Sequence, residues 1–274
     1  MIEILKAVLF GIVQGITEWL PISSTGHLIL LNEFVRLDAR TEFFDMFKVV
    51  IQFGSILAVV VLFWKKIFPF HFHDKQIIQK DIFVMWFKII VACIPCILLA
   101  VFGLDEVCDA KFSNYWVVAI MLILFGVLFL VIESYNHNKA PKITSLNQIS
   151  YFAAFMIGIF QLIAGVFPGT SRSGATIIGA LLLGISRTVA AEFTFFLAIP
   201  TMLGASLLKM LRFGFSFTGM EIAVLLVGMV VAFLVSIVVI RFLMDYIKKH
   251  DFKVFGWYRI VLGLIVIGYF TLTK

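Results

Sequence analysis

Long apolar runs separated by short polar segments extend along almost the whole chain. A membrane-spanning helix needs about 20 mostly apolar residues. Six runs meet that requirement: residues 47–64, 84–104, 115–133, 190–211, 221–243 and 254–272. Two further apolar stretches, 2–20 and 151–167, run into proline, glycine and hydroxyl residues. The pattern predicts an all-α polytopic membrane protein with six transmembrane helices and two segments of a different kind.

Composition supports this class. Of the 274 residues, 62% are hydrophobic and 14% are charged, whereas soluble domains are about 25% charged. The net charge of +6 would suggest nucleic acid as the partner of a soluble protein. Here the basic residues lie in loops, where they set topology and meet anionic lipid headgroups. We therefore expect a single membrane domain, 1–274, in contact with lipid and not with nucleic acid.

Two segments of the chain resemble each other. Residues 11–29, GIVQGITEWLPISSTGHLI, and 158–177, GIFQLIAGVFPGTSRSGATI, both begin Gly-Ile-x-Gln and place proline seven residues after the glutamine. Each then gives a hydroxyl-rich run that ends in glycine. This similarity predicts an internal repeat, with halves of approximately 1–134 and 148–274.

The proline and polar loop of each segment would break a helix at membrane depth. Broken backbone is tolerated there only where it is buried in protein or lines a cavity. Residues 2–35 and 150–187 are therefore predicted to be re-entrant helix-loop-helix hairpins, each followed by three spans. Because an odd number of spans separates the hairpins, the repeat is inverted, and its functional site is expected near the midplane.

Loop charges orient this scheme. Basic residues follow the first, third and fifth spans: Lys65, Lys66, Lys75, Lys80, Lys139, Lys142, Arg241, Lys248, Lys249 and Lys253. Acidic residues occupy the loop after the second span: Asp105, Glu106 and Asp109. The basic side is expected to be cytoplasmic, which puts both termini and the first hairpin outside. Lys209 and Arg212 depart from this rule.

The first hairpin carries a carboxylate in an apolar helix. Glu18 follows Gln14 at i, i+4 spacing, so both side chains lie on one helix face. An ionisable residue inside a membrane segment indicates function. Glu18, with Gln14 beside it, is a candidate metal ligand or a base for a neighbouring hydroxyl.

Hydroxyls and a histidine follow Pro21. Ser23, Ser24 and Thr25 are suited to helix capping, and a helix N-terminus also binds anions. We expect one hydroxyl to cap and another to face a ligand, with Gly26 allowing close backbone approach. His27 is a candidate acid, base or nucleophile.

The second loop carries an arginine. Arg172 keeps its charge, and its planar guanidinium suits bidentate contact with phosphate. Ser171, Ser173 and Thr176 surround it with hydroxyls, and Gly169 lets backbone N–H groups approach an anion. Glu192 is a candidate partner of Arg172 or a second acidic site. Cys93 and Cys96, in C-x2-C spacing around Pro95, are interpreted as small core residues.

The motifs QGITEWLPISSTGH and PGTSRSGATIIG resemble the signatures of bacterial undecaprenyl-pyrophosphate phosphatases of the bacitracin-resistance type. Residues 49–66 and 186–200 also resemble this family. Its E/Q-x-x-x-E motif falls on Gln14 and Glu18, its Ser-Ser-Thr-Gly-His motif on residues 23–27, and its Pro-Gly-x-Ser-Arg-Ser motif on residues 168–173. Because the first acidic position is Gln14, a mechanism that needs two carboxylates on a metal is in doubt.

The resemblance implies hydrolysis of a C55 polyprenyl pyrophosphate, and of shorter polyprenyl pyrophosphates, to the monophosphate and phosphate. That reaction recycles the lipid carrier of peptidoglycan synthesis and confers bacitracin tolerance. The resemblance also implies a divalent cation, Mg²⁺ or Ca²⁺, held by Glu18 and Gln14. It places the protein in the bacterial plasma (inner) membrane, with an active site facing the periplasm or cell exterior. Oligomeric state is left open, a homodimer included.

Phosphoryl transfer depends on positioning and charge neutralisation. The metal and Arg172 are expected to neutralise the pyrophosphate, and Ser24 to attack phosphorus while Glu18 or His27 accepts its proton. The rival assignment makes His27 the nucleophile. A transporter or flippase of a phosphate-bearing polyprenyl lipid is the alternative function, because inverted repeats with broken helices are typical of secondary transporters. A type-2 phosphatidic-acid phosphatase is not favoured, since no histidine follows Ser171-Arg172 at the required distance.

Overall fold

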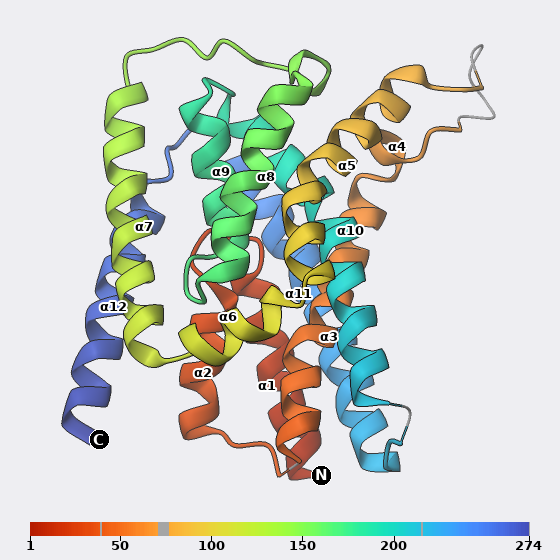
Figure 1. The fold of residues 1–274 in the computed structure, drawn as a ribbon, viewed down its shortest axis with the longest axis vertical. Coiled ribbons are helices and arrows are strands. Elements are labelled where there is room, and N and C mark those ends of the chain that lie inside the picture. Colours follow the sequence, from red (N-terminus) through yellow and green to blue (C-terminus); the bar gives the residue numbers. More distant parts are fainter. Residues whose placement is uncertain (39, 71–76, 215, 274) are drawn as a thin grey trace.

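The computed structural model describes residues 1–38, 40–70, 77–214 and 216–273. Lys75, one of the predicted cytoplasmic charges, lies outside them. The elements are α1 (Ile2–Thr17), α2 (Ser24–Phe34), α3 (Thr41–Leu62), α4 (Trp64–Ile67), α5 (Lys80–Val101), α6 (Leu104–Phe112), α7 (Tyr115–Asn136), the 3-10 helix η1 (Leu146–Gln148), α8 (Tyr151–Val166), α9 (Arg172–Leu182), α10 (Arg187–Phe213), α11 (Gly219–Tyr246) and α12 (Lys253–Thr273). Figure 1 shows an all-helical bundle.

Six of these helices are long and apolar enough to cross a membrane: α3, α5, α7, α10, α11 and α12. They are the six predicted spans, and the chain is a multi-pass membrane protein. Polar caps extend two of them beyond the apolar runs. Ser186 accepts a hydrogen bond from the backbone of Val189 at the start of α10, and Thr218 and Glu221 form a capping box at the start of α11.

The helices turn many large apolar side chains outward. Phe87, Ile120, Val238 and Leu264, on four different spans, are each more than half exposed. On a water-soluble protein so much exposed apolar surface would promote aggregation. It is the surface expected of helices that face lipid.

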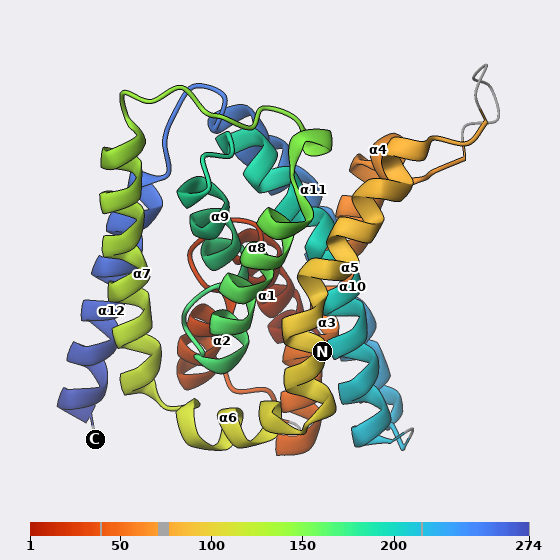
Figure 2. The same cartoon turned by 45° about the horizontal axis from the view of Figure 1, so that its top comes forward.

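The predicted hairpins are α1–α2 and α8–α9. The chain breaks between the helices at residues 18–23 and 167–171. In Figure 1 the first hairpin occupies the lower half of the molecule and the second the upper half, with their loops toward the middle, and both termini lie at the lower end. Figure 2 shows the same two hairpins at the centre of the bundle. This arrangement supports an inverted repeat, and the depth of the hairpins in a membrane stays a prediction.

The first helix of each half packs on a helix of the other half, which is the pattern expected of an inverted repeat. Helix α1 packs on α11 of the second half, and α8 packs on α5 of the first. Both contacts need a glycine at the matched Gly-Ile-x-Gln position. A Cβ on Gly11 would lie 2.7 Å from the carbonyl oxygen of Gly228, and one on Gly158 would overlap the carbonyl oxygen of Ala92.

Charged groups lie at the two ends of the bundle. The basic segments around α4, the α7–α8 connection and the α11–α12 connection lie in the upper half of the molecule in Figure 1, and α6 lies in the lower half. Helix α6 is polar, so hydropathy did not predict it. Its Asp105 and Glu106 form ion pairs with Arg212 at 3.2 and 2.9 Å. Arg212, which departs from the rule that basic residues face the cytoplasm, is therefore neutralised by neighbouring carboxylates.

Candidate active site

Each hairpin loop ends in a serine with strained backbone. Ser23 (φ 74°) and Ser171 (φ 67°) are the two non-glycine residues with positive φ in the described chain. The Ser23 hydroxyl accepts a hydrogen bond from the backbone N–H of Gly26 at 3.3 Å, and that of Ser171 from Gly174 at 3.1 Å. Both serines are therefore the N-caps of the short return helices.

The cap positions align the two halves of the site. Because Ser23 and Ser171 are equivalent, the first residues of α2 and α9, Ser24 and Arg172, are equivalent too. The second loop is one residue longer between its proline and its glycine, which hides this match in the sequence. Ser24 and Arg172 each extend from the N-terminus of a helix, where the helix dipole favours an anion.

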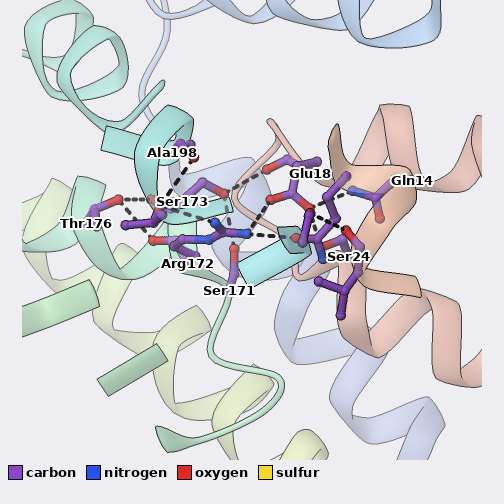
Figure 3. Close-up of polar contacts among 12 residues, drawn as sticks. Gln14, Glu18, Ser24, Ser171, Arg172, Ser173, Thr176 and Ala198 are labelled. Carbon is purple, nitrogen blue, oxygen red and sulfur yellow. Dashed lines mark hydrogen bonds and ion pairs between the residues drawn. The ribbon is translucent and has the colours of Figure 1, made fainter. Parts of the chain in front are cut away.

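Both side chains converge on Glu18. The Ser24 hydroxyl donates to Glu18 Oε2 at 2.8 Å, and the Arg172 guanidinium donates to Glu18 Oε1 at 3.1 Å. Gln14 Nε2 also donates to Oε2, at 2.8 Å, and the Ser173 hydroxyl donates to the backbone carbonyl of Glu18 at 3.1 Å. Figure 3 shows these contacts crossing from one hairpin to the other. Glu18 itself is buried, with 6% exposure.

A polar cavity of about 260 Å³ lies at this junction. The predicted site residues that line it are Glu18, Ser23, Ser24, Thr25, Gly169, Ser171, Arg172 and Ser173. Ser24 and Arg172 thus line one cavity despite their distance in sequence, as the hairpin scheme predicts. Glu18 is the single carboxylate among the described residues that line it.

Four predicted site residues lie outside this cavity lining. Gln14 is fully buried behind Glu18, and the Gly26 backbone serves the Ser23 cap. The Thr176 hydroxyl donates to the carbonyl of Arg172 at 2.9 Å and accepts from Thr194. Gln14 and Thr176 therefore contact cavity residues without facing the cavity.

His27 is the fourth predicted site residue outside the polar cavity. Its Nδ1 lies 2.7 Å from the carbonyl oxygen of Ser23, and its Nε2 lies 2.6 Å from the hydroxyl of Tyr258 on α12, with the two rings stacked. The ring lines a separate apolar cavity that includes Tyr258. The structure therefore does not bring the His27 ring beside Glu18 and Arg172.

Glu192 is also placed elsewhere. Its carboxylate accepts a hydrogen bond from Lys66 at 2.6 Å. The suggestion that it pairs with Arg172 is wrong, because Arg172 pairs with Glu18. Sequence spacing did not reveal this, since the partner of Arg172 is 154 positions away.

Sequence reasoning missed the polar residues that the spans contribute. Arg172 also donates to Gln52 Oε1 on α3 at 3.2 Å and contacts the Thr201 hydroxyl on α10 at 3.5 Å. Cys96, interpreted as a core residue, lines the cavity and accepts from Gln161 Nε2 at 3.5 Å. The sequence signal that could have revealed Gln52 is a polar amide side chain within an otherwise apolar span.

An apolar cavity of about 590 Å³ adjoins the polar one. The two share Cys96, Gly165, Thr201 and Ala205 as lining residues. From there the apolar cavity extends between α5 and α10 to Leu211 and to Asp105 on α6, in the lower half of the molecule in Figure 1. The site therefore combines the small polar cavity with this larger apolar cavity, which is called the apolar groove below.

The donor set suits a hard divalent cation only in part. No group of three or more histidine, cysteine, aspartate or glutamate side chains lies together among the described residues. Mg²⁺, however, is commonly bound by one or two carboxylates together with substrate phosphates and water. Glu18 supplies one carboxylate, and Gln14 Oε1 is a buried oxygen with no hydrogen-bond partner within the described structure. These residues fit a cation that substrate phosphates help to hold.

Fold and site together define a class: a polytopic membrane protein in which two helix N-termini, an arginine and several hydroxyls surround a chamber suited to an anion. Residues 7–265 match the family described as bacitracin resistance protein BacA. The chain therefore belongs to that family.

Curated relatives cover nearly the full length. The chain is 64% identical over 273 residues to an undecaprenyl-diphosphatase of Desulfitobacterium hafniense, covering 99% of this chain and 97% of that protein. It is 62% identical to an undecaprenyl-diphosphatase of Lachnoclostridium phytofermentans, covering 100% and 99%. An undecaprenyl-diphosphatase of Enterococcus faecalis is 60% identical, covering 97% and 96%.

Proposed function

We propose that this protein is an undecaprenyl-diphosphatase, which hydrolyses undecaprenyl pyrophosphate to undecaprenyl phosphate and inorganic phosphate. The names of its relatives support this activity. The observation that carries it is the Ser24–Glu18–Arg172 arrangement: a hydroxyl hydrogen-bonded to a buried carboxylate, beside a guanidinium from the opposite hairpin.

The hydroxyl and the carboxylate account for the first step. The Ser24 oxygen attacks the terminal phosphorus of the pyrophosphate, and its proton passes to Glu18 Oε2, which it already contacts at 2.8 Å. The bond between phosphorus and the bridging oxygen breaks, and undecaprenyl phosphate leaves. Glu18 passes that proton to the departing phosphate oxygen and then takes a new proton from water, whose oxygen attacks the phosphoserine phosphorus. The bond between phosphorus and the Ser24 oxygen breaks, Glu18 returns the proton to that oxygen, and inorganic phosphate leaves.

Arg172 and the helix N-termini stabilise the charge that the pyrophosphate carries. In phosphoryl transfer most of the rate enhancement comes from positioning and electrostatic stabilisation. A divalent cation, Mg²⁺ or Ca²⁺, would be held by Glu18 with Gln14 behind it and would neutralise further phosphate charge. We assign Ser24 as the nucleophile over His27, because both His27 ring nitrogens are already engaged, by the Ser23 carbonyl and the Tyr258 hydroxyl, and the ring lines the separate apolar cavity.

The apolar groove suits the lipid tail. A prenyl chain gains free energy when it leaves water for an apolar surface, and the groove begins at the polar cavity, where the phosphates would lie. Chains shorter than C55 would occupy its first part. We therefore include shorter polyprenyl pyrophosphates among the substrates.

The charge distribution supports an orientation in the bacterial plasma (inner) membrane. The basic end would face the cytoplasm, so the end with both termini, toward which the groove runs, would face the periplasm or cell exterior. Pyrophosphate on the outer leaflet would then reach the cavity from that side.

A phosphate-release assay on purified protein tests the function. We expect release from undecaprenyl and farnesyl pyrophosphates that depends on Mg²⁺ or Ca²⁺ and is lost in Ser24→Ala. Ser134→Ala, which changes an exposed hydroxyl on α7, is the matched control and should keep wild-type rates. Absence of release by the folded wild-type protein would favour a lipid transporter and contradict the proposal.

A further inference from the structure

Arg259 on α12 is a fully buried arginine, with 0% exposure, that takes no part in the chemistry proposed above. Its guanidinium donates only to backbone carbonyls. It forms no ion pair within the described residues, and its Cζ atom lies 5.9 Å from the centroid of the Phe125 ring. A buried charge without a counter-charge is costly. A neutral apolar side chain of similar volume would cost less, so its presence calls for an explanation.

The carbonyls that Arg259 contacts belong to both hairpin loops. Nη1 donates to Pro21 at 3.2 Å, in the first loop. Nη2 donates to Gly169 at 3.1 Å and Thr170 at 2.7 Å, in the second. Longer bonds of 3.4 Å to Met121 and Leu122 anchor the same group to α7. One guanidinium thus connects the two loops behind the polar cavity.

These contacts lie close to the reacting groups. Pro21 is three residues before Ser24, and Thr170 is two residues before Arg172. A Cβ on Gly174, in the first turn of α9, would lie 3.1 Å from Arg259 Nη1. The guanidinium therefore packs directly beneath the helix that presents Arg172.

We propose that Arg259 is a positioning residue: it fixes the two loops relative to each other so that Ser24 and Arg172 both reach one phosphate group. This proposal rests on the proposed function. A planar fork with several donors can contact three loop carbonyls at once, whereas the compact ammonium of lysine cannot keep the same geometry. Misplacing reacting groups by about 1 Å can cost about 100-fold in rate.

Arg259→Lys tests the proposal, with Arg187→Lys as the matched control. Arg187 is a half-buried arginine whose guanidinium pairs with Glu133 on α7, and within the described residues it forms no hydrogen bond to either hairpin loop. We expect Arg259→Lys to lower kcat on farnesyl pyrophosphate at least tenfold, with KM changed less than threefold because Arg172 remains. Arg187→Lys should stay within twofold of wild type in both constants, and size-exclusion profiles and melting curves would verify folding.

Gly174→Ala gives a second route should Arg259→Lys fail to fold. Its methyl group would lie 3.1 Å from the guanidinium and 3.3 Å from the Ser171 side chain, so it would crowd the guanidinium without removing it, and we expect kcat to fall in the same direction. A folded Arg259→Lys with kcat within twofold of wild type would overturn the proposal. So would Gly174→Ala with wild-type kcat, should Arg259→Lys not fold. An inactive wild-type protein would instead refute the proposed function, so the two failures are distinguishable.

Discussion

Replacing Glu18 with glutamine keeps the shape of the side chain and removes its charge. In the structure this carboxylate accepts hydrogen bonds from Gln14, Ser24 and Arg172. The amide offers one acceptor oxygen instead of two, so one of these donors would face an N–H group. Glutamine also cannot take the proton of Ser24 or neutralise Arg172.

The expected loss follows from these contacts. Removing a general base typically costs about 10²–10⁴-fold in rate. Breaking the ion pair also destabilises the fold by on the order of 2 kcal/mol, between the values for exposed and buried pairs. This free energy lies below that of a fully buried ion pair because the Arg172 side chain is 24% exposed, so solvent screens its charge. We therefore expect Glu18→Gln to fold and to lose at least 100-fold in kcat.

The assay measures phosphate release from farnesyl pyrophosphate at saturating Mg²⁺ and at saturating Ca²⁺. Glu192→Gln is the matched control, because Glu192 is similarly buried, at 8% exposure, and pairs with Lys66 at 2.6 Å. It should keep activity within a few-fold of wild type. Glu18→Gln activity within tenfold of wild type in either cation would refute the assignment of Glu18 as proton acceptor and metal ligand.

Three further predictions concern the same site. Arg172→Lys should fold and lose most activity, because a point charge does not reproduce the guanidinium fork; near wild-type turnover would count against it. Gln14→Ala should lower activity less than Glu18→Gln does, and Gln14→Glu should be tolerated; the order of the three rates checks this. Gly204→Phe, at an open position of the apolar groove, should lower kcat/KM more for undecaprenyl than for farnesyl pyrophosphate, and unchanged kcat/KM for both substrates would exclude the groove as the tail site.

Hydropathy alone predicted the six spans, because lipid imposes a length and a composition on each. Helix breakers and matched Gln, Pro and Gly positions predicted the two hairpins. The predicted ends differed where a polar cap extended a helix, as Thr218 does for α11. Helix α6 was missed because it carries Asp105 and Glu106 and shows no apolar run.

The candidate site was predictable in its motif residues and not in its tertiary contacts. Glu18, Ser24 and Arg172 stood out as polar groups in apolar segments. The ring of His27 turns toward Tyr258, a partner 231 positions away, and local spacing gave no sign of it. Gln52 and Arg259 were overlooked although they are polar residues in spans, since their roles depend on loops contributed by other parts of the chain.

The phosphorylated residue tests the central claim most directly. During turnover of a pyrophosphate that carries ³²P in its terminal phosphate, one sample of wild-type protein is quenched in acid and a second in alkaline detergent, which preserves an acid-labile phosphohistidine. If Ser24 is the nucleophile, the protein carries acid-stable, base-labile label on the peptide that contains Ser24, and Ser24→Ala carries none. Acid-labile label that persists in Ser24→Ala and disappears in His27→Ala would contradict the account and assign the attack to His27.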